Sequence, residues 1–316
     1  MNSTASQAAP VIDVAVGVII GPDGRVLMAE RPAGKPSAGY WEFPGGKLEP
    51  GESAAEALAR ELHEELGVEI ETARPWITRL HAYSYATVRL HIHRVTQWHG
   101  EPHAREGQHL SWVDPQAPSV SPLLPANHSI MQALALPAVY AITHAAEYGV
   151  SAFMQRLRTA LANGIRLIQV RERGLPSETL AAFASEVTEL AHACGARVLV
   201  NNDEQLCGIA GADGIHLPAM SLMQRSSRPE GLCGASCHTR EELLHAAALG
   251  VDFVVLSPVL PTRSHPGEPT LGWDAFAALC RELPMPVYAL GGMHVGMLDT
   301  AIAHNAHGVA LLSGIW

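Results

Sequence analysis

The sequence predicts an α/β protein of two domains, an α/β/α sandwich over residues 1–137 and a (β/α)8 barrel lacking its last helix over residues 138–316. The chain of 316 residues is long enough for two domains, and its hydrophobic fraction of 47% provides a core for each. After Leu136-Pro137 the pattern changes to strands and helices that alternate every 25 residues or so, at roughly the spacing of βα units.

The first domain begins with two runs that favour strands. Val11–Ile20 is rich in β-branched residues, residues 21–24 form a Gly-Pro-Asp-Gly turn, and Arg25–Glu30 returns as a second strand, which predicts a hairpin. A loop rich in Pro, Gly, Ser and Ala follows over residues 32–39. It leads to Tyr40–Gly45, next to the start of a helix.

The helix is the most strongly predicted element of this domain. Ser53 and Glu56 form a capping-box pattern, and Gly67 is a natural C-terminal glycine, so the helix should run between them. The leucines spaced by four residues that would pack on a sheet are Leu58, Leu62 and Leu66.

Three carboxylates occupy the neighbouring sector of this helix. Glu61, Glu64 and Glu65 lie at positions i, i+3 and i+4, where like charges repel. Either water screens them or a hard divalent cation binds among them, and ligands that are all oxygen suit Mg²⁺ or Mn²⁺. Arg60, one turn before Glu64, is expected to pair with it or with Glu52 and support the loop.

Gly46, Glu52 and the run Arg60–Val68 have the spacing of the Nudix box, which this stretch resembles at every position. The resemblance implies hydrolysis of a nucleoside diphosphate linked to another group, by water attacking phosphorus with Mg²⁺ or Mn²⁺ as the cofactor. Gly45 and Gly46 let the backbone approach a metal ion or a phosphate closely.

The remaining elements of the domain complete a mixed sheet with helices on its faces. Strands are predicted over Trp76–Tyr83, Thr87–Gln97 and His109–Val113, with a loop over Trp98–Gln108 and a short helix over Asn127–Leu136.

Four further stretches, Trp41–Lys47, Trp98–Pro102, Glu106–Gln108 and Pro125–Asn127, resemble the MutT-type branch, which hydrolyses 8-oxo-dGTP to its monophosphate and pyrophosphate. The catalytic and metal-binding residues implied by the resemblance are Gly45, Glu61, Glu64, Glu65 and Glu106. The implied nucleotide-binding residues are Arg31, Glu42, Phe43 and Asn127. An amide such as that of Asn127 carries a donor and an acceptor and can match a purine edge, although Asn127 is also a good helix N-cap.

Composition limits the partners. A formal net charge of -10 argues against a polynucleotide as partner, whereas a metal ion can bring a small nucleotide to an acidic site. The five cysteines form no CxxC pair, which fits a reducing compartment. Residues 1–10 lack the features of a signal peptide, and apolar runs are too short to span a bilayer, so we expect a cytoplasmic protein without membrane contact.

The second domain contains eight candidate strands, which predict the barrel, with function at their C-terminal ends. The strands are Val139–Thr143, Ile165–Arg171, Arg197–Asn201, Gly214–Leu217, Leu232–Ser236, Phe253–Leu256, Val287–Leu290 and Val309–Leu312. Helical patterns such as Glu178–Ala193 and Arg240–Leu249 fill the gaps. Because the chain ends at Trp316, no eighth outer helix is expected, and we expect the first domain or a second subunit of a homodimer to cover the wall there.

The polar residues at these strand ends resemble the thiamine phosphate synthase family and its relative, the thiazole tautomerase. The resemblance implies a site for the phosphate of a thiamine precursor formed by Gln169, Arg171, Asn201, Ser236, His238, Thr262, Ser264, Gly292 and Ser313. Where the synthases hold Mg²⁺ with two aspartates this chain has Asn202 and Ser221, and the phosphate-loop lysine is His265. Cation binding should therefore be much weaker, and we expect no synthase activity.

His238 stands where the tautomerase transfers a proton, and it is equally explained as a histidine at a helix start. A barrel that binds its ligand without chemistry is a third interpretation. For the whole chain we expect an 8-oxo-dGTP pyrophosphohydrolase. The alternatives are a hydrolase of a thiamine-pathway diphosphate and a hydrolase regulated by ligand binding to the barrel.

Overall fold

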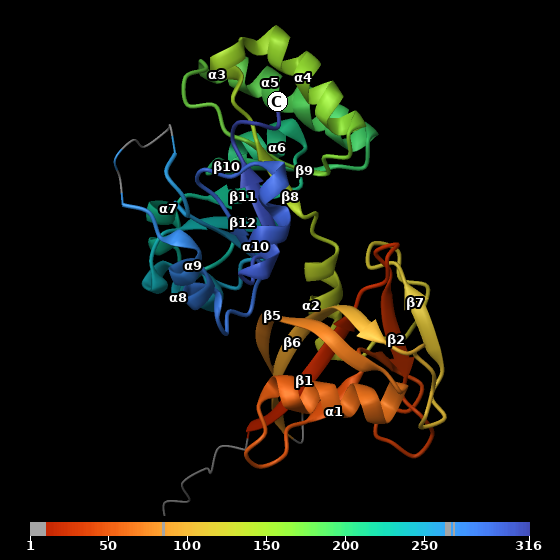
Figure 1. Ribbon diagram of the computed structural model, residues 1–316. Helices are drawn as coiled ribbons and strands as arrows, with labels where there is room; N and C mark the ends of the chain where they lie inside the picture. The colour runs from red at the N-terminus through yellow and green to blue at the C-terminus, as the bar shows by residue number, and fades with distance from the viewer. Residues whose placement is uncertain (1–10, 84–85, 263–266, 268) are drawn as a thin grey trace, which may run out of the picture. The chain divides into compact units, whose positions relative to one another are not determined.

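The computed structural model describes residues 11–83, 86–262, 267 and 269–316. The chain divides into two compact units, Met1–Ala135 and Leu136–Trp316, which are drawn in Figure 1 and described separately below. Within the described residues, no helix combines the length and the apolar character needed to cross a membrane.

Two sheets form the first unit. The four-stranded sheet has the order β4 (Gly45–Lys47), β1 (Val11–Ile19), β6 (Thr87–His99), β5 (Glu69–Ala82), with β1 and β6 parallel and the other pairs antiparallel. The three-stranded antiparallel sheet has the order β3 (Trp41–Glu42), β2 (Val26–Glu30), β7 (Leu110–Val113).

The predicted hairpin is wrong. The predicted mixed sheet with helices on its faces is present as β4-β1-β6-β5, and the separate three-stranded sheet was not predicted. β1 and β2 lie in different sheets and meet only at an isolated bridge between Ile20 and Val26. Both edges of β1 are already paired, with β4 on one side and β6 on the other, so β2 finds its partners elsewhere.

Helix α1 (Ala54–Leu66) follows the prediction closely. Ser53 and Glu56 make both bonds of the capping box, and Gly67 ends the helix in the left-handed conformation with φ of 70°. The buried leucines Leu58, Leu62 and Leu66 pack with Ala15 and Ile19 of β1. The helix is thereby fixed on one face of the four-stranded sheet.

Helix α2 (Pro125–Leu134) covers the opposite face, where Ile130 packs with Val16 and Val18 of β1. It begins two residues earlier than predicted because Pro125 suits the first helical turn and Leu124 occupies the N-cap position. The alternative role of Asn127 as a helix N-cap is therefore wrong.

The second unit is a closed parallel barrel, and all eight predicted strands are present. In chain order they are β8 (Val139–Ile142), β9 (Leu167–Val170), β10 (Arg197–Asn201), β11 (Gly214–Leu217), β12 (Leu232–Cys237), β13 (Phe253–Leu256), β14 (Val287–Ala289) and β15 (Gly308–Leu311), with β15 pairing with β8. The helices are α3 (Ala145–Tyr148), α4 (Val150–Ala162), α5 (Ser177–Ala193), α6 (Glu204–Ala210), α7 (Ala219–Met223), α8 (Arg240–Leu249), α9 (Gly272–Cys280), the 3₁₀ helix η1 (Val295–Met297) and α10 (Leu298–Ala303).

Large aromatic side chains fill the barrel. Tyr140, Phe253 and Tyr288 are fully buried and pack edge to face or tilted against one another. Leu136 belongs to the same cluster and closes the barrel at the end where the strands begin. There the Tyr288 hydroxyl donates to the Pro137 carbonyl at 2.5 Å, which ties the start of this unit to the barrel floor.

Residues 312–316 after β15 contain no helix, as predicted. Ile315 packs against the clusters on both sides of the seam between β15 and β8. The Trp316 indole N–H donates to the Ile142 carbonyl at 2.8 Å. The wall is thus covered in part by the last residues of the chain, and a covering first domain or second subunit remains a prediction.

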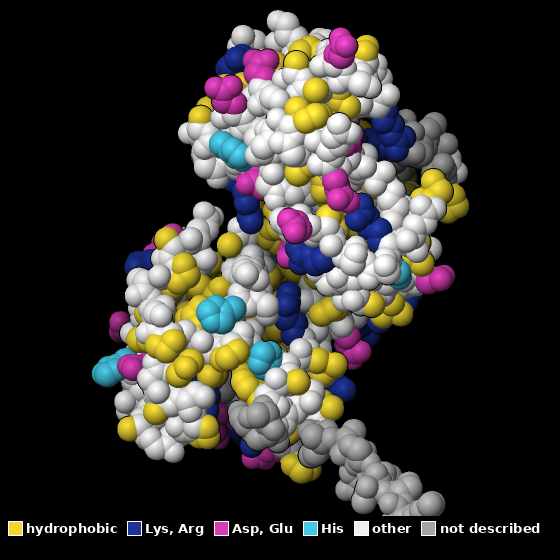
Figure 2. Space-filling model, turned by 180° about the vertical axis from the view of Figure 1, so that it is seen from behind, with side chains coloured by type: hydrophobic (Ala, Val, Ile, Leu, Met, Phe, Trp, Pro, Cys, Tyr) yellow, Lys and Arg dark blue, Asp and Glu magenta, His cyan; other side chains and the backbone are white. Residues whose placement is uncertain are grey.

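Acidic and basic side chains lie side by side on the displayed face of the molecule (Figure 2). In the second domain, for example, Arg228 pairs with Asp252 at 2.7 Å and Arg158 with Glu186 at 3.5 Å. This mixing, together with the net charge of -10, is the opposite of the one-sided basic surface that polynucleotide binders carry.

Candidate active site

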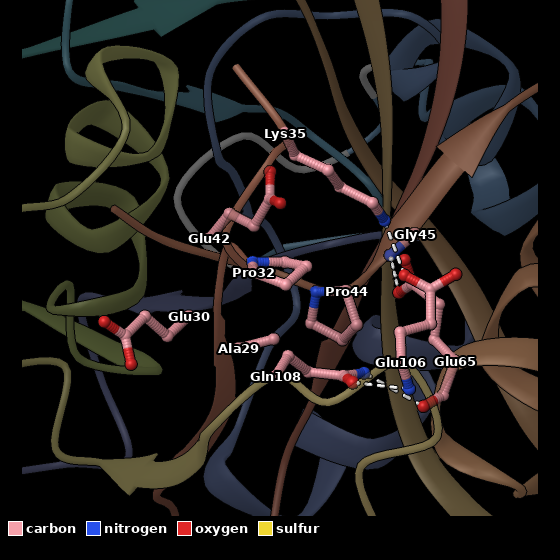
Figure 3. Close-up of a pocket in the computed structure, with 10 residues that line it drawn as sticks. All are labelled: Ala29, Glu30, Pro32, Lys35, Glu42, Pro44, Gly45, Glu65, Glu106 and Gln108. Carbon is pink, nitrogen blue, oxygen red and sulfur yellow. Dashed lines mark hydrogen bonds and ion pairs between the residues drawn. The ribbon is translucent and has the colours of Figure 1, made fainter. Parts of the chain in front are cut away.

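A polar pocket opens beside helix α1 in the first domain (Figure 3). Its lining comes from β2, the loop over residues 32–39, the strand segment that leads to Gly45, the end of α1, and the loop before β7. The lining residues are Ala29, Glu30, Pro32, Lys35, Glu42, Pro44, Gly45, Glu65, Glu106 and Gln108. Four of the ten are glutamates, so the pocket is strongly acidic.

Glu65 is the most perturbed acid of the pocket. Its Oε2 accepts a hydrogen bond from the Gly45 backbone N–H at 3.1 Å. Burial raises the pKa of Glu65 to about 7, the nearby charges of Glu106, Glu61 and Glu42 add to this, and the Gly45 N–H opposes it. A carboxylate in such surroundings is one that a bound cation would stabilise.

Arg60 holds the acidic helix against the loop before it. Its Nη1 donates to Glu61 Oε1 at 2.8 Å and lies 3.4 Å from Glu64 Oε2. The other edge of the guanidinium makes two bonds with the Glu52 carboxylate, at 3.0 and 2.9 Å, and one with the Lys47 carbonyl at 3.1 Å. The predicted pairing of Arg60 with Glu64 or Glu52 is confirmed for both, and Glu61 is an additional partner.

The two glycines before the helix are required by close packing. A Cβ on Gly46 would lie 2.1 Å from Cδ of Glu61. Gly45 has φ of 139°, and a Cβ there would lie 2.1 Å from the Ala15 carbonyl oxygen. The loop can therefore approach the carboxylates of α1 only without side chains at these positions.

Glu106 reaches the same pocket from the loop before β7. Its carboxylate pairs with the Lys35 ammonium, and its backbone N–H donates to Gln108 Oε1 at 2.8 Å. The Gln108 amide also donates to the Glu65 carbonyl at 3.0 Å, which fixes the loop to the end of α1. Sequence reasoning missed Lys35 and Gln108, because neither belongs to the helix pattern and because the contacts of Lys35 with Glu106 and of Gln108 with Glu65 join segments distant in the chain.

The predicted nucleotide-binding residues fall into two groups. Arg31 Nη1 contacts both oxygens of Glu42 at 2.6 Å, and burial raises the pKa of Glu42 against the opposing effect of Arg31. Arg31 Nε also donates to the Pro36 carbonyl at 2.7 Å, so the pair holds the 32–39 loop. Phe43 is buried in the core, and Asn127 is 5% exposed, with its amide 3.5 Å from the Trp41 carbonyl.

The carboxylates are the type of ligand that a hard cation prefers, but their oxygen atoms do not converge on one point. Within the described residues, no group of three or more His, Cys, Asp or Glu side chains is arranged to hold a metal ion. Glu61 and Glu64 contact Arg60, and Glu106 contacts Lys35, so basic groups stand where a cation would be expected. The oxygen donors that would hold Mg²⁺ or Mn²⁺ are Glu61, Glu65, Glu106 and the backbone of Gly45, whereas Glu64 is 58% exposed at the periphery.

A second polar cluster lies at the C-terminal ends of the barrel strands. The Gln169 amide on β9 donates to Asn201 Oδ1 on β10 at 3.2 Å. Ser236 on β12 lies 2.8 Å from Nε2 of His216, whose Nδ1 lies 3.2 Å from the Tyr140 hydroxyl. Three of the predicted ligand residues are thus interior groups at the barrel mouth, and His216 joins them.

Sequence reasoning missed His216, although it is an inward position between the outward Ile215 and Leu217 in a four-residue strand. Burial lowers the pKa of His216 to about 3, with the charge of Arg171 as a second cause. Burial likewise lowers the pKa of Arg171, whose backbone N–H donates to the Thr143 hydroxyl at 2.9 Å.

The other predicted barrel residues are more dispersed. His238 is exposed immediately before Thr239, the N-cap of α8, and its Nδ1 lies 2.8 Å from the Ser257 carbonyl. Gly292 has φ of 68°, and a Cβ there would lie 2.8 Å from the Pro261 carbonyl oxygen. Thr262 is partly buried, Ser313 is exposed, and Ser264 lies outside the described residues.

The fold and these sites define a protein with a hydrolase domain, built around an acidic pocket beside one helix, and a barrel domain with a polar mouth. The chain belongs to the NUDIX domain family, whose model matches residues 15–133, and to the thiamine monophosphate synthase family, whose model matches residues 139–315. Nudix hydrolases generally depend on a divalent metal ion, commonly Mg²⁺.

Known proteins resemble the two parts separately. A putative thiamine-phosphate synthase of Geobacter sulfurreducens is 38% identical over 183 residues, covering 56% of this chain and 85% of the relative. A second putative thiamine-phosphate synthase, from Aquifex aeolicus, is 33% identical over 181 residues, 56% of this chain and 97% of the relative. The CTP pyrophosphohydrolase of Escherichia coli is 42% identical over 118 residues, 37% of this chain and 87% of the relative.

Proposed function

We propose that the first domain hydrolyses a nucleoside triphosphate to its monophosphate and pyrophosphate, with 8-oxo-dGTP as substrate, and so removes damaged nucleotides before DNA synthesis. The observation that carries the proposal is the placement of Glu65, which is partly buried, bonded to the Gly45 N–H and surrounded by other carboxylates. Such a site needs a cation and can hold one at the phosphates of a nucleotide.

The residues act in two groups around the diphosphate bond. Glu61, Glu65, Glu106 and Gly45 bind the metal ion, which supplies charge neutralisation at phosphorus and acidifies water. Arg60 keeps Glu61 and the 45–52 loop in register with the helix, and Gln108 keeps the Glu106 loop against Glu65. Glu64, exposed at the edge of the helix, is a further candidate ligand.

We assign recognition of the base to Asn127, and contact with the ribose or the phosphates to the 32–39 loop. Asn127 is buried, yet among the residues that the structure describes its amide makes only a long contact of 3.5 Å, with the Trp41 carbonyl. Its donor and acceptor are therefore available to match a purine edge that presents both. Arg31 and Glu42 position this loop at the edge of the pocket.

A second candidate substrate is CTP, which is favoured by the likeness of this domain to the CTP pyrophosphohydrolase of Escherichia coli. Competition kinetics with 8-oxo-dGTP, dGTP, CTP and a thiamine-pathway diphosphate separate the candidates. A preference of 8-oxo-dGTP over dGTP supports the first, a preference for CTP supports the second, and hydrolysis of none of them by the metal-loaded protein contradicts both.

For the barrel we propose binding of a phosphorylated thiamine precursor without synthase chemistry. The polar groups Gln169, Asn201 and Ser236 provide the site, whereas Asn202 and Ser221 replace acidic ligands. Calorimetry with thiazole phosphate, with and without Mg²⁺, tests binding, and formation of thiamine phosphate from both precursors would contradict the loss of synthase activity. A change in nucleotide hydrolysis on adding the ligand would support a regulatory barrel.

We also propose that the protein acts in the cytoplasm on small phosphorylated molecules and that it can form a homodimer. Size-exclusion chromatography with light scattering tests the dimer.

A further inference from the structure

Lys35 is the only basic residue among the ten described residues that line the acidic pocket. It lies in the loop over residues 32–39, and its side chain extends toward Gly45, Glu65 and Glu106 (Figure 3). Its ammonium pairs with the carboxylate of Glu106, which is 71 residues away in the chain. This contact therefore depends on the folded pocket and not on local sequence.

The loop is held so that Lys35 stays at the pocket. Arg31 bonds to the Pro36 carbonyl at 2.7 Å and to Glu42 at 2.6 Å. The Lys35 backbone N–H donates to the Pro32 carbonyl at 3.3 Å, which adds a turn within the loop. Two anchors thus hold the backbone on either side of Lys35.

Lys35 lies in the field of three carboxylates. Its pKa is raised first by the hydrogen bond to Glu106, and the charges of Glu65 and Glu42 contribute further. The side chains of Lys35 and Glu106 nevertheless remain 46% and 41% exposed, and ion pairs this exposed contribute little to stability. A stabilising role does not explain a lysine aimed at the predicted metal ligands.

We infer that Lys35 is a phosphate-binding residue that exchanges partners, pairing with Glu106 in the metal-free protein and with the phosphates of the nucleotide once a divalent cation occupies Glu106. The exchange is favoured because the cation neutralises Glu106 and leaves the ammonium without its anion, just as an anionic triphosphate arrives. The inference rests on the proposed function, since it assigns Lys35 to the same nucleotide site.

Lys35→Met keeps most of the aliphatic side chain and removes its charge. The exchange of partners predicts that this variant binds Mn²⁺ more tightly and the nucleotide more weakly. Without the competing ammonium, Mn²⁺ should bind the nucleotide-free protein about three- to fivefold more tightly. A non-hydrolysable α,β-methylene analogue of dGTP, with Mg²⁺ present, should bind about five- to tenfold more weakly. Lys35→Arg should stay within about twofold of the wild type in both.

The experiment measures Mn²⁺ binding by electron paramagnetic resonance and analogue binding by calorimetry, on the full chain. Arg25→Met is the matched control, because it removes one positive charge from a similarly exposed ion pair with Asp23 in the same domain. The inference is overturned if Lys35→Met leaves Mn²⁺ affinity unchanged or weakens it, or if its analogue affinity equals that of Arg25→Met.

Failure of the proposed function looks different. If the wild-type protein binds the analogue but hydrolyses no nucleoside triphosphate, the proposed activity fails, and the role of Lys35 is still decided by the two affinities of Lys35→Met. If the wild-type protein binds no analogue at all, the role of Lys35 fails, whereas the proposed activity is decided by the competition kinetics.

Discussion

The backbone of Gly46 lies directly against the carboxylate of Glu61, so closely that a Cβ on Gly46 would lie 2.1 Å from Cδ of the glutamate. Real atoms cannot approach to that distance. Either the loop or the carboxylate would have to move if this glycine acquired a side chain.

Gly46→Ala is therefore expected to displace Glu61 and to lower kcat/KM for nucleotide hydrolysis by about 10- to 100-fold, since small misplacements of catalytic groups are costly. Steady-state kinetics measure the loss. Gly174→Ala is the control, because a Cβ there would meet no atom within 4 Å. Equal activity of both variants would mean that the position of Glu61 is unimportant.

Glu65→Gln removes an anionic ligand while keeping the shape of the side chain. Because Glu65 lies off the buried leucine stripe, the fold should persist, and kcat should fall by about 100-fold or more. Kinetics at saturating Mg²⁺, with circular dichroism to verify folding, provide the measurement. The exposed Glu69→Gln serves as the charge control, and full activity in Glu65→Gln would remove Glu65 from the ligand set.

The pKa of Glu65 also predicts how stability depends on pH. Since the folded state raises this pKa to about 7, ionising Glu65 costs stability as the pH rises from the unfolded value of 4.5 through 7. We therefore compare the unfolding free energy of metal-free Glu65→Gln with that of the metal-free wild type. The difference should favour the variant by about 1–3 kcal/mol more at pH 8 than at pH 4. Urea unfolding of the first domain in EDTA at the two pH values measures this. A relative stability that does not change with pH would place Glu65 in water.

The stability contributed by His216 in the barrel changes with pH in the opposite direction. Its folded pKa of about 3 lies below the ordinary value of 6.5, so its contribution to stability is complete above pH 6.5 and is lost as the pH falls toward 3. Nitrogen-15 NMR at pH 5 should show a neutral imidazole whose signals are absent in His216→Asn. A charged imidazole at that pH would contradict the hydrogen-bonded cluster with Tyr140 and Ser236.

Asn127 is predicted to select the base. Asn127→Ala should reduce the preference for 8-oxo-dGTP over dGTP by about tenfold, because it removes the paired donor and acceptor. Specificity constants for both nucleotides provide the measurement, with Ser129→Ala on the same helix as control. An unchanged ratio, with both constants lowered equally, would reduce Asn127 to a packing role.

The parts of the structure that were predicted correctly are those that depend on local sequence patterns. The capping box, the leucine stripe and the pairing of Arg60 with Glu64 all depend on residues within about two helical turns, where spacing determines contact. The eight barrel strands were found for a similar reason, because each is a short apolar run between turns.

Contacts between distant segments were not predictable in this way. The hairpin failed because the partners of β1 are chosen by the sheet as a whole, through β4 and β6. The pairing of Lys35 with Glu106 spans 71 residues, and His216 is a single inward position in a strand too short to show alternation. The sequence named the candidate metal-binding carboxylates and the pairing of Arg60 with Glu64, but not the contacts of Arg60 with Glu61 and of Lys35 with Glu106.

The most direct test of the account is anomalous diffraction from crystals grown with Mn²⁺ and the α,β-methylene analogue of dGTP. We predict a manganese peak bound by Glu61, Glu65 and Glu106, with Lys35 no longer paired with Glu106. Glu106 still paired with Lys35, with no manganese between the carboxylates at saturating concentration, would contradict the proposed metal site.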